Sequence, residues 1–306
     1  MSDNPGRELT GACPAPLVSV VVLAYNHERF IEQAVESVLA QRTTFPVEIL
    51  VGEDCSTDRT RELLTRLDTR YPGRLTLLFR ESNLGLSRNL QDCREKAAGR
   101  YMAILEGDDY WIDSGKLQKT ADAMEAHPDW SMVFHSAKVF HDDGSGNELT
   151  APVNPPDAPL GVHEMLLENR VPTHSVSMFR QGLIVRTPEW HNRLRNGDWA
   201  LNVMHADRGP IGFIPDVMTA YRVHQGGLWS GSKSFDRWQQ TILLFDCLEE
   251  YFQGRYLKEI RNGRELLLSQ LRQRVADLEK IERRYLALKL DRIAAVFKWL
   301  RECCGR

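Results

Sequence analysis

Short apolar runs alternate with amphipathic stretches along the first 127 residues of the chain. Residues 17–23, LVSVVVL, form a β-branched run that is typical of a strand buried on both faces of a parallel sheet. Over residues 28–41, apolar side chains recur every three or four positions, which predicts a helix. The alternation repeats, with strands predicted at 47–51, 75–79 and 101–105 and helices at 57–70, 87–97 and 113–127. This order predicts an α/β fold whose open, mostly parallel sheet is flanked by helices.

The elements predicted for the second half of the chain are shorter and less regular. Strands are expected at 130–134 and 137–140, and the Pro-rich stretch 150–159, TAPVNPPDAP, predicts an internal boundary. Beyond it the pattern predicts a short helix near 162–169, a strand near 175–179, a helix after Asp198, and strands around 211–214 and 217–223. From residue 234 the chain is predicted to be helical almost to its end, with breaks near Gly254 and Gly263.

Charge is distributed unevenly along the chain. Residues 255–306 carry fourteen Lys and Arg against seven Asp and Glu, a net charge of +7. Since the whole chain carries −3, the preceding residues carry −10. Nucleic-acid phosphates are held by clustered cations, so this acidic body argues against a nucleic-acid partner.

Cysteine usage and hydropathy bear on the compartment. The six cysteines, at 13, 55, 93, 247, 303 and 304, include no CxxC pair, which favours a reduced, cytoplasmic protein. The first sixteen residues lack the layout of a signal peptide, and no apolar run approaches the roughly 18–20 residues of a membrane span. We therefore expect the protein on the cytoplasmic side.

The C-terminal segment has a long apolar stripe at helical spacing, running from Leu257 to Leu288. One interpretation is packing against the body of the protein or a homodimer formed through these helices. The other is peripheral contact with the inner face of a membrane, because basic residues accompany apolar ones near the end of the chain: Lys289, Arg292, Lys298 and Arg301. The sequence leaves both open.

Polar side chains follow several of the predicted strands directly. Tyr25-Asn26 follows the first strand, Glu53-Asp54 the second, and Asn83-Leu84-Gly85 comes shortly after the third. In open α/β sheets, ligands bind outside the carboxyl ends of the strands. These positions, with the acidic run after the fourth strand, therefore predict one polar site.

That acidic run is Glu106-Gly107-Asp108-Asp109. Carboxylates held this close together destabilise one another unless a cation or a proton compensates. A divalent ion with oxygen ligands is the natural compensator, and Mg²⁺ or Mn²⁺ would bridge the protein to a diphosphate. The alternative, that Asp108 and Asp109 only cap the next helix, accounts for one carboxylate better than for three.

Together these motifs, in this order and at these strand ends, resemble the family-2 glycosyltransferases of the GT-A fold, over roughly residues 16–230. The resemblance implies a nucleotide-sugar site at Ala24, Tyr25, Asn26, Glu28, Glu53, Asp54, Asn83, Arg88, Asp108 and Arg222. Within it, Asp54 would accept the imide N–H of a uracil. The metal ligands would be Asp109, Asp108 and His224, binding Mn²⁺ or Mg²⁺. The longer side chain of Glu106, where the family often has Asp, leaves its contact with the metal open.

The resemblance also implies a catalytic base. Asp198, in Gly197-Asp198-Trp199, matches the position at which the family keeps this base, although a helix N-cap is the alternative for an isolated Asp. The later motif, residues 221–227, would bring His224 to the metal and Arg222 to the phosphates. The stretch around Thr173 resembles one that lines the sugar or acceptor pocket.

The expected function is therefore a metal-dependent, inverting glycosyltransferase that uses a nucleotide sugar, most simply a UDP-sugar, in surface-glycan or glycosylated-metabolite synthesis. The acceptor would be a sugar, a lipid-linked glycan or another hydroxyl compound. The alternatives are a sugar-nucleotide pyrophosphorylase and a non-catalytic nucleotide-sugar-binding or scaffold protein. The expected organisation is a flexible N-terminus (1–15), a catalytic domain (16–232, with halves 16–140 and 141–232) and a helical C-terminal region (233–306).

Overall fold

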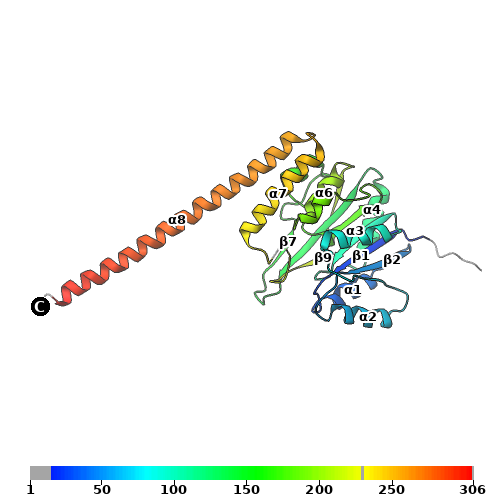
Figure 1. Cartoon of the computed structure of the whole chain (residues 1–306), viewed down its shortest axis with the longest axis horizontal. Helices are drawn as coiled ribbons and strands as arrows, with labels where there is room; N and C mark the ends of the chain where they lie inside the picture. Colours follow the sequence, from blue (N-terminus) through cyan, green and yellow to red (C-terminus); the bar gives the residue numbers. More distant parts are fainter. Residues whose placement is uncertain (1–14, 229–230, 305–306) are drawn as a thin grey trace, which may run out of the picture.

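The structure of the protein is a computed structural model, which describes residues 15–228 and 231–304. Over these residues nine strands form one curled sheet, in the order β3-β2-β1-β4-β8-β6-β9-β5, with β7 paired to β6 (Figure 1). Most of the predicted N-terminal segment, including Cys13, lies outside the described residues.

The first half of the sheet is parallel, as the alternating pattern predicts. β1 (Val18–Ala24) lies between β2 (Val47–Glu53) and β4 (Tyr101–Glu106), and β3 (Thr76–Phe79) pairs with β2. The crossovers contain α1 (Ile31–Leu39), α2 (Thr60–Arg70) and α3 (Leu86–Lys96), and α4 (Lys116–Ala126) follows β4 and the short β5 (Tyr110–Trp111). Because β1, β2 and β4 run in the same direction, their carboxyl ends meet at one edge.

The second half of the sheet mixes parallel and antiparallel pairs. β8 (Ser177–Arg180) is antiparallel to both β4 and β6 (Met132–His141), whereas β6 and β9 (Ile211–Val223) run in parallel. The sequence predicts two strands at 130–134 and 137–140 and two more at 211–214 and 217–223. The structure instead has one continuous strand at each place, β6 and β9, and the pairing between them shifts register near Ser136. β7 (Glu148–Ala151) occupies part of the stretch predicted as a loop.

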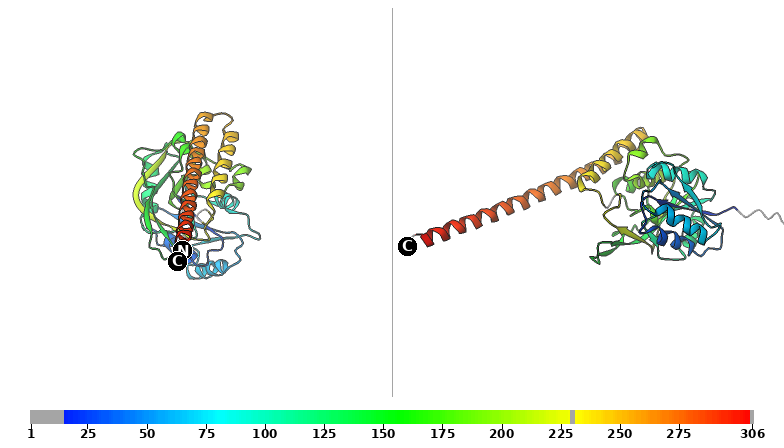
Figure 2. Two further views of the ribbon diagram at one scale, coloured as in Figure 1. Left: turned by 90° about the vertical axis from the view of Figure 1, so that its left-hand side faces the viewer. Right: turned by 60° about the horizontal axis from the view of Figure 1, so that its bottom comes forward.

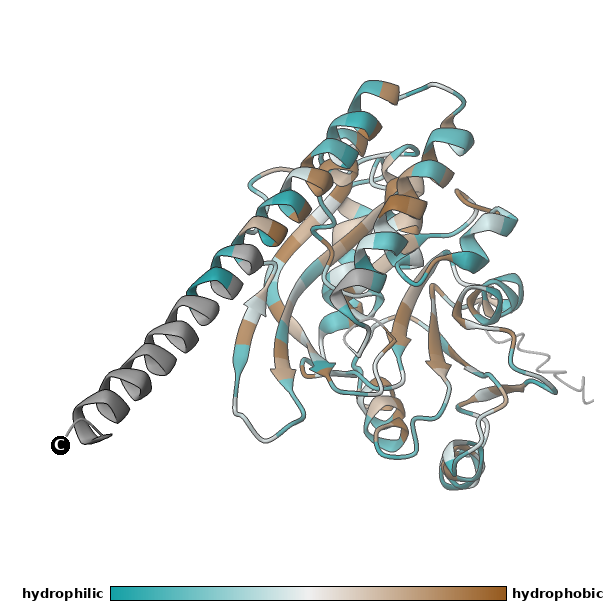
Figure 3. Ribbon diagram, turned by 60° about the vertical axis from the view of Figure 1, so that its left-hand side comes forward, coloured by the Kyte–Doolittle hydropathy of each residue, from teal (hydrophilic) through white to brown (hydrophobic). Residues whose placement is uncertain are grey.

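Apolar side chains fill both faces of the sheet. One cluster, under α1, α2 and α4, includes Val20, Val35 and Leu64, and the other, under α3, α5, α6 and α7, includes Ile104, Phe134 and Phe245. Figure 3 shows apolar residues along the strands and along the faces of the covering helices. The central strands β1 and β4 are thus covered on both sides, which accounts for their continuous apolar runs.

The remaining elements gather on the second face: α5 (Val162–Leu167), the 3₁₀ turns η1 (His174–Val176) and η2 (Glu189–Arg193), α6 (Gly197–Ala206) and α7 (Ser234–Phe252). α8 (Leu257–Cys304) begins against α5 and α7 and then projects from the body as one long helix (Figures 1 and 2). The predicted break near Gly254 is present, at the turn between α7 and α8. The predicted break at Gly263 is wrong, because the helix runs through it.

The described residues include no helix long and apolar enough to cross a membrane. The side chains of residues 285–304, on which the expectation of membrane contact rests, are outside those that the structure describes. Neither that expectation nor the homodimer is tested by the fold.

Gly263 allows α8 to dock on α5, and this predicts an unusual response to substitution. A Cβ at Gly263 would lie 2.3 Å from the carbonyl oxygen of Leu166, closer than any side-chain carbon can approach. Within a helix, Gly→Ala normally stabilises by about 1 kcal/mol. We expect Gly263→Ala instead to lower the free energy of unfolding, measured by urea denaturation. Ser269→Ala, on an exposed turn of the same helix, is the matched control and should leave stability within about 0.5 kcal/mol.

Candidate active site at the carboxyl edge of the sheet

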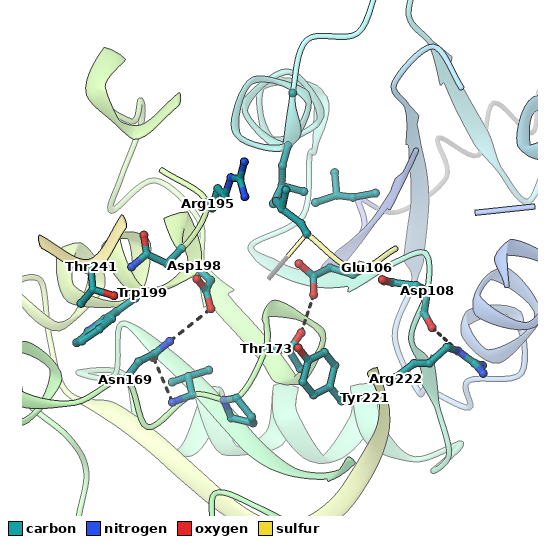
Figure 4. Close-up of a pocket in the computed structure, with 18 of the residues that line it drawn as sticks. Glu106, Asp108, Asn169, Thr173, Arg195, Asp198, Trp199, Tyr221, Arg222 and Thr241 are labelled. Carbon is teal, nitrogen blue, oxygen red and sulfur yellow. Dashed lines mark hydrogen bonds between the residues drawn. The ribbon is translucent and has the colours of Figure 1, made fainter. Parts of the chain in front are cut away.

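A cavity of about 740 Å³ lies at the carboxyl ends of β1, β2 and β4 and extends between α5, α6, α7 and the start of α8 (Figure 4). Its size is in the range of small-molecule and cofactor sites. Five residues of the predicted site line this cavity: Ala24, Tyr25, Asp54, Asn83 and Asp198. Asp108 and Arg222 also line it, with the contacts described below.

The strand register brings the first of these residues together. Ala24 of β1 is paired with Glu53 of β2, and Leu23 with Glu106 of β4, so the loops after the three strands begin side by side. In the loop after β2, the two carboxylate oxygens of Asp54 accept hydrogen bonds from the backbone N–H groups of Leu84 and Gly85, at 2.7 and 2.9 Å. Asp54 therefore fixes the turn before α3 while it faces the cavity.

Glu106 ends β4 in the middle of the cavity wall. The hydroxyl of Thr173 donates to its Oε2 at 2.7 Å, and the Nδ1 atom of His174 lies 4.0 Å from its Oε1. Burial, together with the negative charges of Asp108 and Asp198, raises the pKa of Glu106 to about 8. A carboxylate so placed gains from a nearby cation, since its ionised form is otherwise costly.

Asp108 projects into the cavity two residues later, beside two histidines. Its Oδ2 lies 3.0 Å from Nε2 of His224 and 4.0 Å from Nε2 of His27. Burial opposes ionisation of Asp108, but the hydrogen bond from His224 and the charges of both histidines bring its pKa below the ordinary value. Gly107 makes this approach feasible, because a Cβ there would lie 2.6 Å from Nδ1 of His27.

Asp109 has a different place from the one that the sequence predicts. It is 1% exposed and is absent from the cavity wall. Its Oδ1 accepts the backbone N–H of Arg222 at 2.9 Å, and its Oδ2 accepts the hydroxyl of Ser175 at 2.6 Å. Burial and the neighbouring carboxylates raise the pKa of Asp109 well above its usual range. These contacts join the loop after β4 to β9 and η1, and the role of Asp109 as a metal ligand stays a prediction.

Asp198 faces Glu106 across the cavity from the first turn of α6 (Figure 4). The side-chain amide of Asn169 donates to its Oδ2 at 3.4 Å. Behind it, Nε2 of His191 lies 2.9 Å from the carbonyl oxygen of Gly197 and so holds the start of the helix. Burial raises the pKa of Asp198. A carboxylate with a raised pKa is suited to accepting a proton.

Arg222 lines the cavity, but its guanidinium is engaged by the protein. Nε donates to the carbonyl oxygen of Asp108, and one terminal nitrogen donates to Oε1 of Gln33, each at 2.9 Å. The guanidinium also lies 4.5 Å from the ring centroid of Phe30 and 4.8 Å from that of Phe140. In this structure Arg222 holds the backbone at Asp108, and its contact with the phosphates stays a prediction.

Four more predicted donor residues lie outside the cavity wall. Glu53 is fully buried and pairs with Arg61 at 2.5 Å. The side chain of Asn26 accepts from the backbone N–H of Thr57 at 2.8 Å, which braces the two loops against each other. The other two make exposed ion pairs, Glu28 with Arg59 at 3.1 Å and Arg88 with Glu189 at 3.4 Å. In this structure these residues shape the loops and do not face the cavity.

One wall of the cavity comes from elements to which the sequence patterns give no functional role. Thr241 and Phe245 of α7, and Leu266, Leu267 and Gln270 of α8, line it on the side of Asp198. The C-terminal helices are therefore part of the site and are not a separate segment. The helical spacing predicts α7 and α8, but nothing in a local pattern says which element a long helix packs against.

The sequence also gives no role to Arg195, two residues before Gly197. Its backbone N–H donates to Oε1 of Gln240 at 2.8 Å. Its exposed side chain lines the cavity, and among the described residues its guanidinium has no carboxylate partner in an ion pair. Arg195 is thus available to an anionic ligand.

The donor set partly fits a divalent ion. No three His, Cys, Asp or Glu side chains of the described ranges converge into a complete metal centre. Asp108 and His224 nevertheless offer oxygen and imidazole donors at one place, and Nε2 of His27 lies 4.0 Å from the same Asp108 oxygen. Burial lowers the pKa of His27, which favours its neutral form. Such a set suits an ion that takes its remaining ligands from substrate phosphates and water.

The chain is similar to known proteins both in sequence and in fold. The family described as Glycosyl transferase family 2 matches residues 19–187. An uncharacterized protein of Mycobacterium tuberculosis is 35% identical over 212 residues, which cover 69% of this chain and 60% of that protein. The chain thus spans about 60% of the length of this curated relative.

Two solved structures share the fold. S. aureus TarS 1–349 in complex with UDP-GlcNAc has a TM-score of 0.54 and 21% identity, covering 74% of this chain and 65% of that one. Mannosyltransferase PcManGT from Pyrobaculum calidifontis, in complex with GDP-Man and Mn²⁺, has a TM-score of 0.58 and 18% identity, covering 82% and 70%. At these identities the likeness concerns the fold, and it confirms the predicted α/β, GT-A class.

Proposed function

Because the chain belongs to glycosyl transferase family 2, we propose that it transfers a sugar from a nucleotide-sugar donor to a hydroxyl acceptor, with a divalent metal and with inversion at the anomeric carbon. The observation that carries this proposal is the meeting of Glu106, Asp108 and Asp198 in one cavity at the carboxyl edge of the sheet. We further propose residues 16–232 as the catalytic domain, completed by a wall from α7 and α8.

The donor would occupy the part of the cavity next to β1, β2 and β4. Asp54 uses one lone pair of each oxygen on the backbone at Leu84 and Gly85, so it retains acceptor capacity for the imide N–H of a uracil. Tyr25, which is 43% exposed, offers a ring on which a base can stack. TarS was solved with UDP-GlcNAc and PcManGT with GDP-Man, and we propose that Asp54 accepts the imide N–H of a uracil here.

Asp108 and His224 would hold the divalent ion, with Glu106 close by. When bound, the ion would stabilise the negative charge of the departing nucleoside diphosphate. Arg195 would add a positive charge at the mouth of the same cavity. Arg222 and Asp109 keep Asp108 in place from behind.

Asp198 would act as the general base. Its carboxylate faces the space next to Glu106, and Asn169 holds one of its oxygens. An acceptor hydroxyl bound there would give its proton to Asp198 as its oxygen bonds to the anomeric carbon, while the bond from that carbon to the diphosphate oxygen breaks. A single base on the side opposite the leaving group gives inversion.

Titration of the protein with UDP and with GDP, with and without Mn²⁺, tests the donor assignment. We expect calorimetry to show UDP binding that strengthens at least about tenfold when Mn²⁺ is present, because the ion joins Asp108 to the diphosphate. Asp54 could also accept from N1–H and the 2-amino group of guanine, so the comparison of UDP with GDP identifies the base; the uridine assignment predicts that GDP binds more weakly than UDP.

Uridine without phosphates is the matched control, and its affinity should not respond to Mn²⁺. Absence of nucleotide binding would contradict the transferase proposal. Binding of UDP that is indifferent to Mn²⁺ would contradict only the metal, and tighter binding of GDP would overturn the uridine assignment.

A further inference from the structure

The cavity is lined by exposed leucines from three separate segments. Leu167 is the last residue of α5, Leu228 lies in the loop after β9 and Leu266 is on α8, and they are 44%, 52% and 45% exposed. Single exposed apolar side chains are ordinary on protein surfaces. Three that converge on one cavity from different parts of the chain form a surface on which an apolar group can bind.

Several polar groups of this part of the wall are satisfied within the protein. The indole N–H of Trp199 donates to the carbonyl oxygen of Met165 at 2.6 Å, so the cavity receives only its ring. The hydroxyl of Thr241 donates to the carbonyl oxygen of Arg237 at 2.9 Å. Asn169 is held by Asp198 and by the backbone N–H of Val171. Hydroxyl groups need free donors and acceptors, and the buried side-chain amide of Asn196, which has no hydrogen-bond partner among the described residues, offers both two residues before Asp198.

Further apolar side chains lie next to the three leucines, both inside the cavity and along α8. Val171, Pro172 and Phe245 line the cavity behind the leucines. On α8, Leu267, Leu271 and Val275 follow at four-residue spacing, and Val275 is 47% exposed. The polar lining residues Glu168 and Gln270 are both exposed to solvent. The apolar surface therefore runs from the neighbourhood of Asp198 out along α8.

We propose that the acceptor is an amphiphile: a hydroxyl-bearing head group next to Asp198, joined to an aliphatic chain that lies on Leu167, Leu228 and Leu266. This inference rests on the proposed function, because it names the acceptor of that reaction. The chain would be held by burial of its methylenes and would leave the cavity beside α8. The surface discriminates by chain length and not by the hydroxyl pattern of a second sugar.

Alkyl β-D-glucosides with methyl, hexyl and octyl chains, used below their critical micelle concentrations, are suitable probes. We expect the dissociation constant, measured by calorimetry on the full chain, to fall with chain length, by up to about fourfold for each methylene buried. Leu266→Ser and Leu167→Ser should each weaken octyl glucoside binding about tenfold. Leu149→Ser is the matched control, because Leu149 is 49% exposed on β7 and is not among the cavity residues.

Equal affinities for the methyl and octyl glucosides would overturn the proposal, as would an equal loss in the Leu149→Ser control. A change in molar mass for Leu266→Ser by sedimentation, without any chain-length dependence, would assign the leucines to a second copy of the chain and also overturn it. UDP binding is titrated separately on the same sample. Chain-length dependence without nucleotide binding would overturn the proposed function and leave the apolar site standing, whereas nucleotide binding without chain-length dependence would overturn the site alone.

Discussion

Asp198→Asn should bind the nucleotide sugar as the unaltered protein does and lose transfer by about 10²–10⁴-fold, the range expected when a positioned base is removed. The amide that replaces the carboxylate is nearly isosteric and can still pair with Asn169, which donates to Oδ2 at 3.4 Å. Donor affinity should hold because Asp54 and Asp108, at the other side of the cavity, are unchanged. The measurements are calorimetric titration with UDP and a single-turnover transfer assay.

Asp122→Asn, a neutralised carboxylate on the exposed side of α4, is the matched control and should retain full transfer. The variant also bears on pH. Burial raises the pKa of Asp198, and a base works only when ionised, so the transfer rate should fall as the pH drops through that raised pKa. This acid limb should lie above the usual range of an Asp and should vanish from the residual activity of Asp198→Asn. Retained turnover in the variant would remove Asp198 from the mechanism.

Asp108→Asn should abolish the effect of Mn²⁺ on UDP affinity. Loss of residues that only support a metal ligand weakens metal binding by about 10–100-fold, so loss of a direct ligand should reach at least about 100-fold. The neutral amide keeps the volume of the side chain and its neighbours His27 and His224, so the fold should persist. Calorimetry with UDP at increasing Mn²⁺ measures the effect.

Asp109→Ala provides the contrast, because the two neighbouring carboxylates have different surroundings. Its removal leaves the backbone N–H of Arg222 and the hydroxyl of Ser175 without their partner in the interior, which costs about 1–3 kcal/mol. We expect a lower melting temperature with a residual Mn²⁺ effect on UDP binding. If Asp109→Ala loses the metal effect at unchanged stability while Asp108→Asn keeps it, then of the two carboxylates predicted as metal ligands only Asp109 is one.

The parallel half of the fold could be read from the sequence because its signals are local. A β-branched run such as 17–23 predicts a doubly covered strand wherever it packs, and the strand direction then brings the residues after β1, β2 and β4 to one edge. The sequence therefore predicts that Asp54, Asn83 and Asp108 lie close together at the carboxyl edge of the sheet. The position of this edge depends on the direction of the backbone strands and not on the side chains.

Which side chains turn toward the cavity was not predictable in the same way. Glu53 and Asp54 are neighbours, yet one pairs with Arg61 in the interior and the other faces the ligand space, and the choice depends on a helix eight residues further on. Asp108 and Asp109 differ because Asp109 alone accepts hydrogen bonds from the hydroxyl of Ser175 and the backbone N–H of Arg222. Both of these partners belong to the second half of the chain. Local spacing contains no information on those distant partners.

α8 is 48 residues long, about 72 Å at 1.5 Å per residue, and it is continuous from the cavity wall to Cys304. A straight helix couples distance to rotation: each residue advances the chain and turns it by about 100°. A partner that binds the outer part of α8 would therefore fix both the distance of the cavity from that partner and the rotation of the cavity about the helix axis. One residue inserted midway would swing the mouth by more than a quarter of a turn relative to that anchor, without altering a single contact inside the catalytic body.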